Sequence, residues 1–259
     1  MSQVAVEPDS RGPEDDPGID DNTMPAAGAG GSSRVPHWTR EWIRPLFLAV
    51  LLFLVVRIFL IEAFRIPTGS MQETLLAGDF VLVNKAAYGA RVPFTPIRLP
   101  AFERPERGDV IVFAPPHDAA RNYVKRLVGS PGDTVAMRNK VLFVNGHEVD
   151  EPYARHSDRD DLYPPGSFWQ CRFLSRPDRS NECHPSRDNW GPIVVPADAY
   201  LVLGDNRDDS EDSRYWGFVP RNAIRGRPLV VYYSFRPDGA RSVPWLTGVR
   251  WKRIGRAVH

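Results

Sequence analysis

The chain has 259 residues, of which 42% are hydrophobic and 25% are charged, and its formal net charge is +1. A chain of this length can bury the core of one or two domains, and its composition is ordinary for a globular protein. Because no basic excess is available to neutralise phosphates, the charge balance argues against a nucleic-acid-binding protein.

The amino-terminal segment, residues 1–36, contains acidic pairs together with Gly, Pro, Ser and Ala, and almost no large apolar side chains. Such a segment cannot bury enough apolar surface to offset the entropy that is lost on ordering. We therefore predict a disordered tail over residues 1–36, which the membrane orientation derived below would place in the cytoplasm.

A long apolar segment follows, running from Pro45 to Phe64. Its apolar residues occupy every side of the predicted helix, which favours lipid over a soluble core. About 20 residues are enough to cross a hydrocarbon layer of about 30 Å. Residues typical of a membrane interface and of a cytoplasmic amino end precede the segment; they are Arg34, Trp38, Arg40, Trp42 and Arg44. We predict a transmembrane anchor with its flanks over residues 37–64.

Arg57 is the residue that fits a membrane span least, because a charge in hydrocarbon is costly unless it reaches an interface. Two alternatives therefore stay open, a cleaved signal peptide and a buried helix of a soluble domain. The long tail ahead of the apolar segment and the lack of an A-x-A-like site after it count against a cleaved signal peptide.

Beyond the anchor, short β-rich runs separated by turn residues predict a mainly β architecture. The predicted strands are Phe80–Val83, Asp109–Phe113, Val141–Val144, Tyr200–Leu203 and Leu229–Tyr233. We expect residues 65–150 and 193–259 to form one β domain. Residues 151–192 are charged and rich in proline, without a clear period, and are predicted to be an insertion, either a small excursion domain or a long surface loop.

The chain has two cysteines, Cys171 and Cys183, and both lie in the predicted insertion. No CxxC pair or Cys/His cluster with zinc-site spacing accompanies them. A disulfide that closes a short loop and two unpaired thiols are both compatible with the sequence.

Ser70 comes directly after the predicted anchor, in the run Ile66–Leu75. On its own, a serine after a glycine is typical of a helix N-cap or a turn. A nucleophilic serine needs a base, which is usually a histidine. None of the six histidines lies in a sequence context that resembles a catalytic motif.

A lysine can replace histidine as the base when its amine is neutral, and Lys125 lies in the apolar, strand-like run Tyr123–Val128. At an ordinary pKa of about 10.4, only about one lysine in a few thousand is neutral at pH 7. Burial in an apolar pocket lowers the pKa by several units and removes most of this penalty. Without such burial, Lys125 would be an ordinary exposed strand lysine.

A third segment, Gly204–Pro220, is densely polar between two predicted strands, which fits a solvated loop or a hydrogen-bonded scaffold beneath an active site. With this segment the chain resembles the bacterial type I signal peptidases, or leader peptidases, which are serine proteases with a Ser-Lys dyad. The matching segments occur in the family's order; they are Pro67–Met71, Asp79–Lys85, Arg107–Phe113, Tyr123–Arg126 with Gly132-Asp133, and Gly204–Pro220.

The resemblance implies a catalytic role for the matching residues. Ser70 would attack the scissile carbonyl, and Lys125 would accept its proton and later protonate the leaving amine. The backbone N–H of Ser70 and the hydroxyl of Thr68 would hold the oxyanion. Ser210 would orient the Lys125 amine.

Other matching residues would support the site without taking part in the chemistry; they are Gly204, Asp205, Asp212 and Arg214. Asp212 and Arg214 are expected to form an ion pair. Lys85 is the second candidate for the base. Asp209 stands where many relatives have asparagine, and because a nearby carboxylate would raise the pKa of Lys125, we predict that Asp209 points away from it.

The resemblance also implies a signal-peptidase-like β-fold catalytic domain with an extended insertion, preceded by one transmembrane helix, and no metal or organic cofactor. The implied substrates are signal peptides of exported preproteins, cut after small residues, and nucleic acid is not an expected partner. The enzyme would be a single-pass protein anchored in the lipid bilayer of the bacterial cytoplasmic membrane. Its catalytic domain would lie on the periplasmic or extracytoplasmic side.

Two other functions are compatible with parts of the sequence. A self-cleaving, repressor-type Ser-Lys protease would share the dyad, but it would be soluble and would usually carry a DNA-binding helix-turn-helix. A membrane-anchored β domain that binds without catalysis differs from a protease only in activity.

Overall fold

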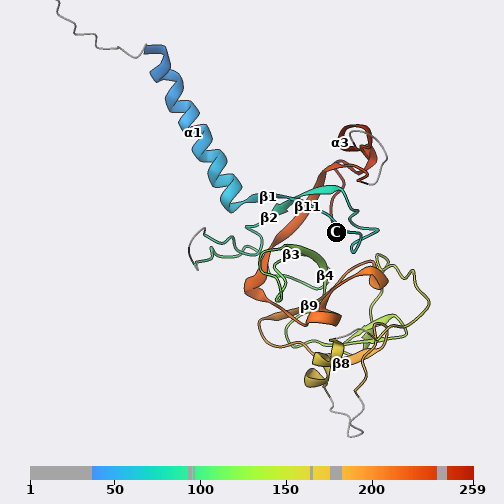
Figure 1. The fold of residues 1–259 in the computed structure, drawn as a ribbon. Coiled ribbons are helices and arrows are strands. Elements are labelled where there is room, and N and C mark those ends of the chain that lie inside the picture. The colour runs from blue at the N-terminus through green and yellow to red at the C-terminus, as the bar shows by residue number, and fades with distance from the viewer. Residues whose placement is uncertain (1–36, 93–94, 96, 164–165, 176–182, 238–243) are drawn as a thin grey trace, which may run out of the picture. The chain divides into compact units, whose positions relative to one another are not determined.

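The computed structural model describes residues 37–92, 95, 97–163, 166–175, 183–237 and 244–259 (Figure 1). The disordered tail predicted for residues 1–36 lies outside the described residues. The chain divides into a unit of residues 1–45 and a unit of residues 46–259. The elements that surround the candidate site all belong to the second unit.

Helix α1 spans His37–Phe59 and contains Pro45. Within the part of the chain that the structure describes, Glu41–Phe59 is the one helical segment that is long and apolar enough to cross a membrane, by length and composition. None of this segment is buried by the rest of the protein, which does not fit the alternative of a buried helix in a soluble domain.

The predicted anchor extends to Phe64, but α1 ends at Phe59 and residues Ile61–Arg65 form strand β1. Strand β1 pairs antiparallel with β2 (Asp79–Asn84). The backbone N–H and C=O groups of β1 therefore find hydrogen-bond partners in a sheet, where a longer helix would have paired them within the helix. Apolar content alone does not separate the end of a helix from a short strand. The helical part of the predicted segment therefore ends at Phe59, and residues Ile61–Phe64 belong to a strand.

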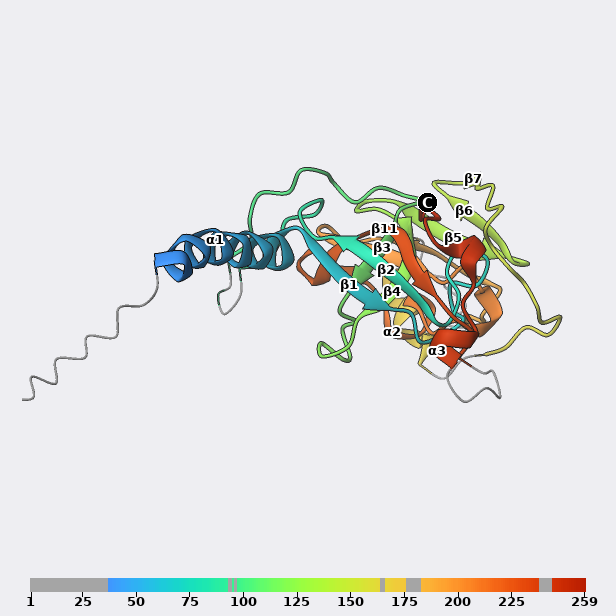
Figure 2. The ribbon, with the colours of Figure 1, turned by 90° about the horizontal axis from the view of Figure 1, so that it is seen from above.

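Seven strands form the first sheet, in the order β1-β2-β11-β3-β4-β9-β10, and each neighbouring pair is antiparallel (Figures 1 and 2). The strands not yet given are β3 Val110–Phe113, β4 Tyr123–Gly129, β9 Ala199–Leu203, β10 Val219–Pro220 and β11 Ile224–Ser234. Strand β11 is long and irregular, and it pairs with β2 through its carboxyl-terminal part and with β3 through its amino-terminal part.

A second sheet has the order β7-β6-β5-β8. Its strands are β5 Thr134–Arg138, β6 Val141–Val144, β7 His147–Glu148 and β8 Trp190–Val194. A buried cluster joins this sheet to β9, because Val135 and Ile193 pack with Leu201 and Leu203. The mainly β fold class is thus confirmed, and each of the five predicted strands lies within or overlaps an observed one.

The region predicted as an insertion, residues 151–192, is more ordered at its end than we expected. It contains the 3₁₀ helix η1, Ser167–Phe173, and its last residues belong to β8, which pairs with β5. Cys171 and Cys183 form a disulfide. Of the two states that the sequence left open, the structure has the bridged one.

Short helices complete the fold; they are η2 Arg207–Asp209, α2 Ser213–Trp216, η3 Arg221–Ala223, α3 Pro244–Thr247 and η4 Trp251–Arg253. The sheet order decides how the three chemistry-bearing segments meet. Ser70 lies in the turn between β1 and β2, Lys125 is on β4, and Ser210 follows β9, which is the neighbour of β4.

Candidate active site

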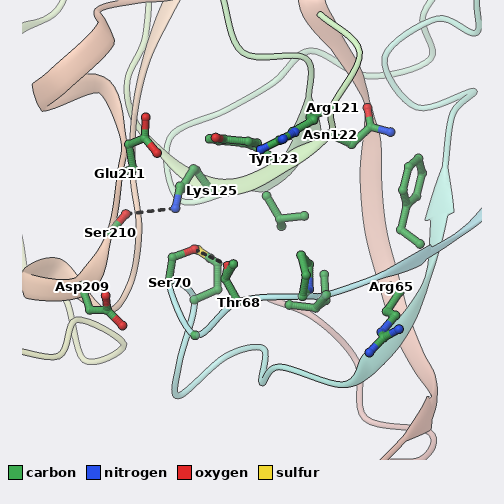
Figure 3. A pocket seen from close by; sticks show the side chains of 16 residues that line it. Arg65, Thr68, Ser70, Arg121, Asn122, Tyr123, Lys125, Asp209, Ser210 and Glu211 are labelled. Atoms are coloured by element: carbon green, nitrogen blue, oxygen red, sulfur yellow. Dashed lines mark hydrogen bonds between the residues drawn. The ribbon is translucent and has the colours of Figure 1, made fainter. Parts of the chain in front are cut away.

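A pocket of about 480 Å³ brings the three segments together (Figure 3). Its walls come from Phe64–Met71, Arg121–Lys125 and Asp209–Glu211. None of the described residues that line it is a histidine. Much of the wall is apolar, and the apolar side chains are those of Phe64, Ile66, Met71 and Val124, with the ring of Tyr123.

Lys125 is buried on strand β4, with 3% of the residue exposed. Its amine donates a hydrogen bond of 3.0 Å to the hydroxyl of Ser210. Burial lowers the pKa of Lys125 to about 8, against the opposing attraction of Asp212. At this pKa about one molecule in ten carries a neutral amine at pH 7, so a usable base is present near neutral pH.

The hydroxyl of Ser210 has a fixed direction. It lies 2.8 Å from Oδ2 of Asp212, to which it donates its one proton. The same oxygen can therefore only accept from Lys125. Ser210 thus holds the Lys125 amine without competing for the lone pair that a base needs.

Asp212 is fully buried and is paired with Arg214 through two hydrogen bonds of 2.8 Å. Burial raises the pKa of Asp212, but the charge and hydrogen bonds of Arg214 outweigh burial and hold this pKa below its ordinary value. The Arg214 charge also lowers the pKa of Lys125. The pair therefore supplies a carboxylate acceptor for Ser210 while Arg214 offsets part of its effect on Lys125.

Gly204 directly follows strand β9, at a position where no side chain fits. A Cβ atom built on it would lie 2.5 Å from the carbonyl oxygen of Ser70 and 2.6 Å from Cβ of Ser210. Its own N–H donates to Asp212 at 3.0 Å. A glycine here lets the Ser70 turn and the Ser210 loop approach each other.

Apolar packing and backbone hydrogen bonds both hold the Ser70 turn in place. Met71 and Leu75 are buried in the core beneath it, and the carbonyl of Ser70 accepts from the Asn206 N–H at 3.1 Å. The Thr68 and Ser70 hydroxyl oxygens are 3.5 Å apart. In Figure 3 the side chains of Ser70 and Lys125 point toward the same space in the pocket.

A buried ion pair lies beneath the pocket, between Arg126 and Asp205, with one N–O distance of 2.7 Å and a second of 2.8 Å. Thr74 donates to the same carboxylate at 2.5 Å. This network ties the Ser70 turn, β4 and the loop after β9 together. Sequence reasoning missed Arg126 and Thr74. Arg126 lies in the matching segment Tyr123–Arg126 and follows Lys125 on a strand, so its side chain faces the opposite side, but neither signal identified its partner.

Two further residues from the sequence predictions, Asp209 and Lys85, lie outside the Ser70–Lys125–Ser210 group. Asp209 is exposed at the pocket rim, and in Figure 3 its carboxylate points away from Lys125. Lys85, the second candidate for the base, does not line this pocket; its amine donates to the Arg57 carbonyl at 2.9 Å and lies 3.5 Å from Glu62.

Comparison with known proteins gives consistent matches. The family described as "Signal peptidase, peptidase S26" matches residues 39–233. A signal peptidase I of Pseudomonas aeruginosa is 40% identical over 235 residues, which is 85% of this chain and 79% of that protein. A signal peptidase I of Pseudomonas fluorescens is 38% identical over 210 residues, covering 75% and 72%. A crystal structure of a signal peptidase I from Enterococcus faecalis is 31% identical, covers 49% of this chain and 98% of that one, and has a TM-score of 0.34.

Proposed function

The chain belongs to the signal peptidase family, peptidase S26, and is an enzyme of the signal peptidase I type; on this premise we propose that Ser70 and Lys125 form its catalytic dyad. One observation carries the proposal. A buried amine whose pKa is lowered to about 8 shares a pocket with the Ser70 hydroxyl, and the described lining offers no histidine as an alternative base.

The proposed reaction has two halves. Ser70 Oγ attacks the scissile carbonyl while neutral Lys125 takes its proton, and the resulting ammonium then protonates the leaving amine as the C–N bond breaks. In the second half, Lys125 takes a proton from a water molecule that attacks the acyl-enzyme carbonyl. The ester bond to Ser70 Oγ then breaks, Lys125 returns the proton to Ser70, and the carboxylic acid end of the cleaved peptide is released. The Ser70 N–H and the Thr68 hydroxyl stabilise the oxyanion, a contribution typically of about 3–4 kcal/mol per donor.

The surroundings of the amine support this assignment. Ser210 is already committed as a donor to Asp212, so it orients Lys125 as an acceptor. Without Arg214, the Asp212 carboxylate would hold Lys125 more strongly in its charged form. These groups are positioning residues, since they act through the lysine and do not touch the substrate.

The proposed substrates are signal peptides of exported preproteins, entering as an extended chain. Apolar walls next to Ser70, contributed by Ile66, Met71 and Val124, would accept the small side chains that precede the cut. A large side chain would have to displace residues of the core on which the Ser70 turn rests.

We propose that α1 anchors the enzyme in the cytoplasmic membrane and that the catalytic unit lies on the extracytoplasmic side. Basic residues ahead of the apolar segment favour a cytoplasmic amino end. The disulfide between Cys171 and Cys183 fits an oxidising compartment. Both features point to the periplasm or its equivalent for residues that follow the helix.

The test is cleavage of a purified preprotein by the full-length enzyme in detergent. The Ser70→Ala and Lys125→Ala variants should lose cleavage. The matched controls Ser175→Ala and Lys252→Ala alter exposed residues outside the pocket and should retain it. Cleavage retained by either pocket variant would exclude the dyad, and a wild-type protein that binds the preprotein without cutting it would favour a non-catalytic β domain.

A further inference from the structure

A second pocket, of about 290 Å³, shares no lining residue with the first. Among the residues that the structure describes, five basic side chains, one carboxylate (that of Glu62) and two uncharged residues line it. The basic residues are Arg57, Lys85, Arg91, Arg98 and Arg225. Charged residues of one sign repel one another, so this grouping stores unfavourable energy unless an anion relieves it.

Arg98 is fixed at the centre of this basic pocket by backbone groups. Its guanidinium donates to the carbonyls of Asn222 and Ile224, each at 2.7 Å. These acceptors hold the side chain but do not neutralise it. Partial burial, followed by repulsion from Arg91, Arg221 and Arg225, lowers the pKa of Arg98 below its ordinary value.

Neighbouring arginines leave the positive charge unbalanced. Arg91 is exposed and lies opposite Arg98 in an isolated β-bridge. Arg225 donates to the backbone carbonyl of Ala119 at 3.0 Å. Glu62, the one carboxylate among the described residues lining the pocket, lies 3.5 Å from Lys85. Guanidinium groups arranged in this way match the geometry of phosphate oxygens.

The location of the basic pocket indicates the source of the phosphate. Arg57 and Ile58 belong to the last turn of α1, where the membrane-length segment Glu41–Phe59 ends. Exposed apolar side chains occur in the adjoining chain; they are Leu60, Ile61, Ile97 and Leu99. Apolar and basic side chains at the end of a membrane span are typical of the lipid headgroup level.

We propose that the basic pocket binds the phosphate group of an anionic phospholipid headgroup. This inference rests on the proposed membrane anchoring of α1, which brings the pocket to headgroup depth. A soluble phosphate ester would offer the same chemistry, but it would gain nothing from the end of an apolar span. Bound lipid would relieve the repulsion around Arg98 and would hold the residues after the helix at the bilayer surface.

The test measures lipid binding by the full-length protein in detergent micelles, by native mass spectrometry and by the shift in Tm. Four additives are compared: phosphatidylglycerol, phosphatidylcholine, inorganic phosphate and sn-glycerol 3-phosphate. The test variant is Arg91→Gln/Arg225→Gln. The matched control, Arg159→Gln/Arg172→Gln, removes the same charge from exposed positions in the insertion.

Phosphatidylglycerol should bind and raise Tm for the wild type and the control variant, with phosphatidylcholine having a smaller effect. In the test variant its affinity should fall about 25-fold, because each of the two basic residues near an anionic surface contributes about fivefold. Arg91→Glu, at an exposed position, should give a similar loss if the double variant fails to fold.

Equal phosphatidylglycerol binding by the wild type and the test variant would overturn the proposal. Soluble phosphate or glycerol phosphate that stabilises the wild type as strongly as the lipid would overturn the lipid source. Preprotein cleavage is measured in the same preparations without added lipid. A wild type that binds phosphatidylglycerol but does not cleave the preprotein would count against the proposed dyad alone. A wild type that cleaves the preprotein but does not bind phosphatidylglycerol would count against the basic pocket alone.

Discussion

The two pockets place a lysine in opposite environments. Lys125, on β4, is buried and hydrogen-bonded to a neutral hydroxyl, and its pKa is lowered to about 8. Lys85, directly after β2, is paired with Glu62 and a backbone carbonyl in a pocket that four arginines also line. A lysine can act as a base where burial disfavours its charged form, and it can bind an anion where the ammonium is stabilised by its neighbours.

The two lysines differ in how the nearest carboxylate reaches the amine. Behind Lys125, the carboxylate of Asp212 reaches the amine only through Ser210 and is paired with Arg214. Lys85 faces Glu62 directly. A hydroxyl placed between a lysine and a carboxylate therefore allows a polar scaffold to orient the amine without forming an ion pair with it.

Replacing Lys125 by arginine keeps a charge on β4 but removes the base, because a guanidinium cannot be deprotonated in a protein. We expect kcat/KM for preprotein cleavage to fall by about 10³- to 10⁴-fold. Lys85→Arg keeps the charge that its pocket uses and should leave cleavage within about twofold of the wild type. Comparable losses in the two variants would contradict the distinction between the lysines.

Gly204→Ala tests the approach of the Ser70 turn to the Ser210 loop. The added Cβ must displace the Ser70 carbonyl or Ser210, and a displacement of about 1 Å at a reacting group costs about 100-fold in rate. Its control is Gly226→Ala, which would also meet backbone, at Asn84, but lies outside the catalytic pocket. Both variants should lower Tm, whereas only Gly204→Ala should lower kcat per folded enzyme.

The pH dependence follows from the pKa of Lys125. Because the neutral amine is the active form, kcat/KM should rise about tenfold per pH unit below pH 8 and level off above it. Histidine would give a plateau about one to two pH units lower. The profile is measured with a preprotein substrate in detergent, and a rate that is flat from pH 6 to pH 9 would argue against lysine as the base.

Much of this fold is visible in the sequence, because the strands that line the core alternate or concentrate apolar residues between turn residues. Strand β1 was not predicted, since its residues Ile61–Arg65 continue the apolar run of the preceding helix. The boundary predicted at residue 192 divides strand β8, because its pairing partner, β5, lies more than 50 residues away in the chain. Its pattern is also interrupted by Gly191 and Pro192.

The candidate site divides in the same way. Its three segments match short motifs of the signal peptidase family, so Ser70, Lys125 and Ser210 could be proposed from that resemblance. The pairing of Arg126 with Asp205 and the crowding around Arg98 depend on contacts between distant strands and loops. The lowered pKa of Lys125 also depends on burial, which no local pattern specifies.

The same substitution to methionine should change stability with opposite signs at the two lysines. Below pH 8 the buried ammonium of Lys125 destabilises the fold, and this cost is relieved as pH rises from about 8 to about 10.5, where the unfolded chain still holds the proton. Lys125→Met removes the cost and should raise the free energy of unfolding at pH 7 by about 1–2 kcal/mol, at the expense of activity. Lys85→Met loses a partly exposed ion pair and should lower the free energy of unfolding by less than about 1 kcal/mol.

Denaturant unfolding of the two variants and the wild type at pH 7 and pH 10 measures these changes. The stability advantage of Lys125→Met over the wild type should shrink at pH 10. An advantage of equal size at both pH values would mean that packing, rather than the buried charge, separates the two lysines.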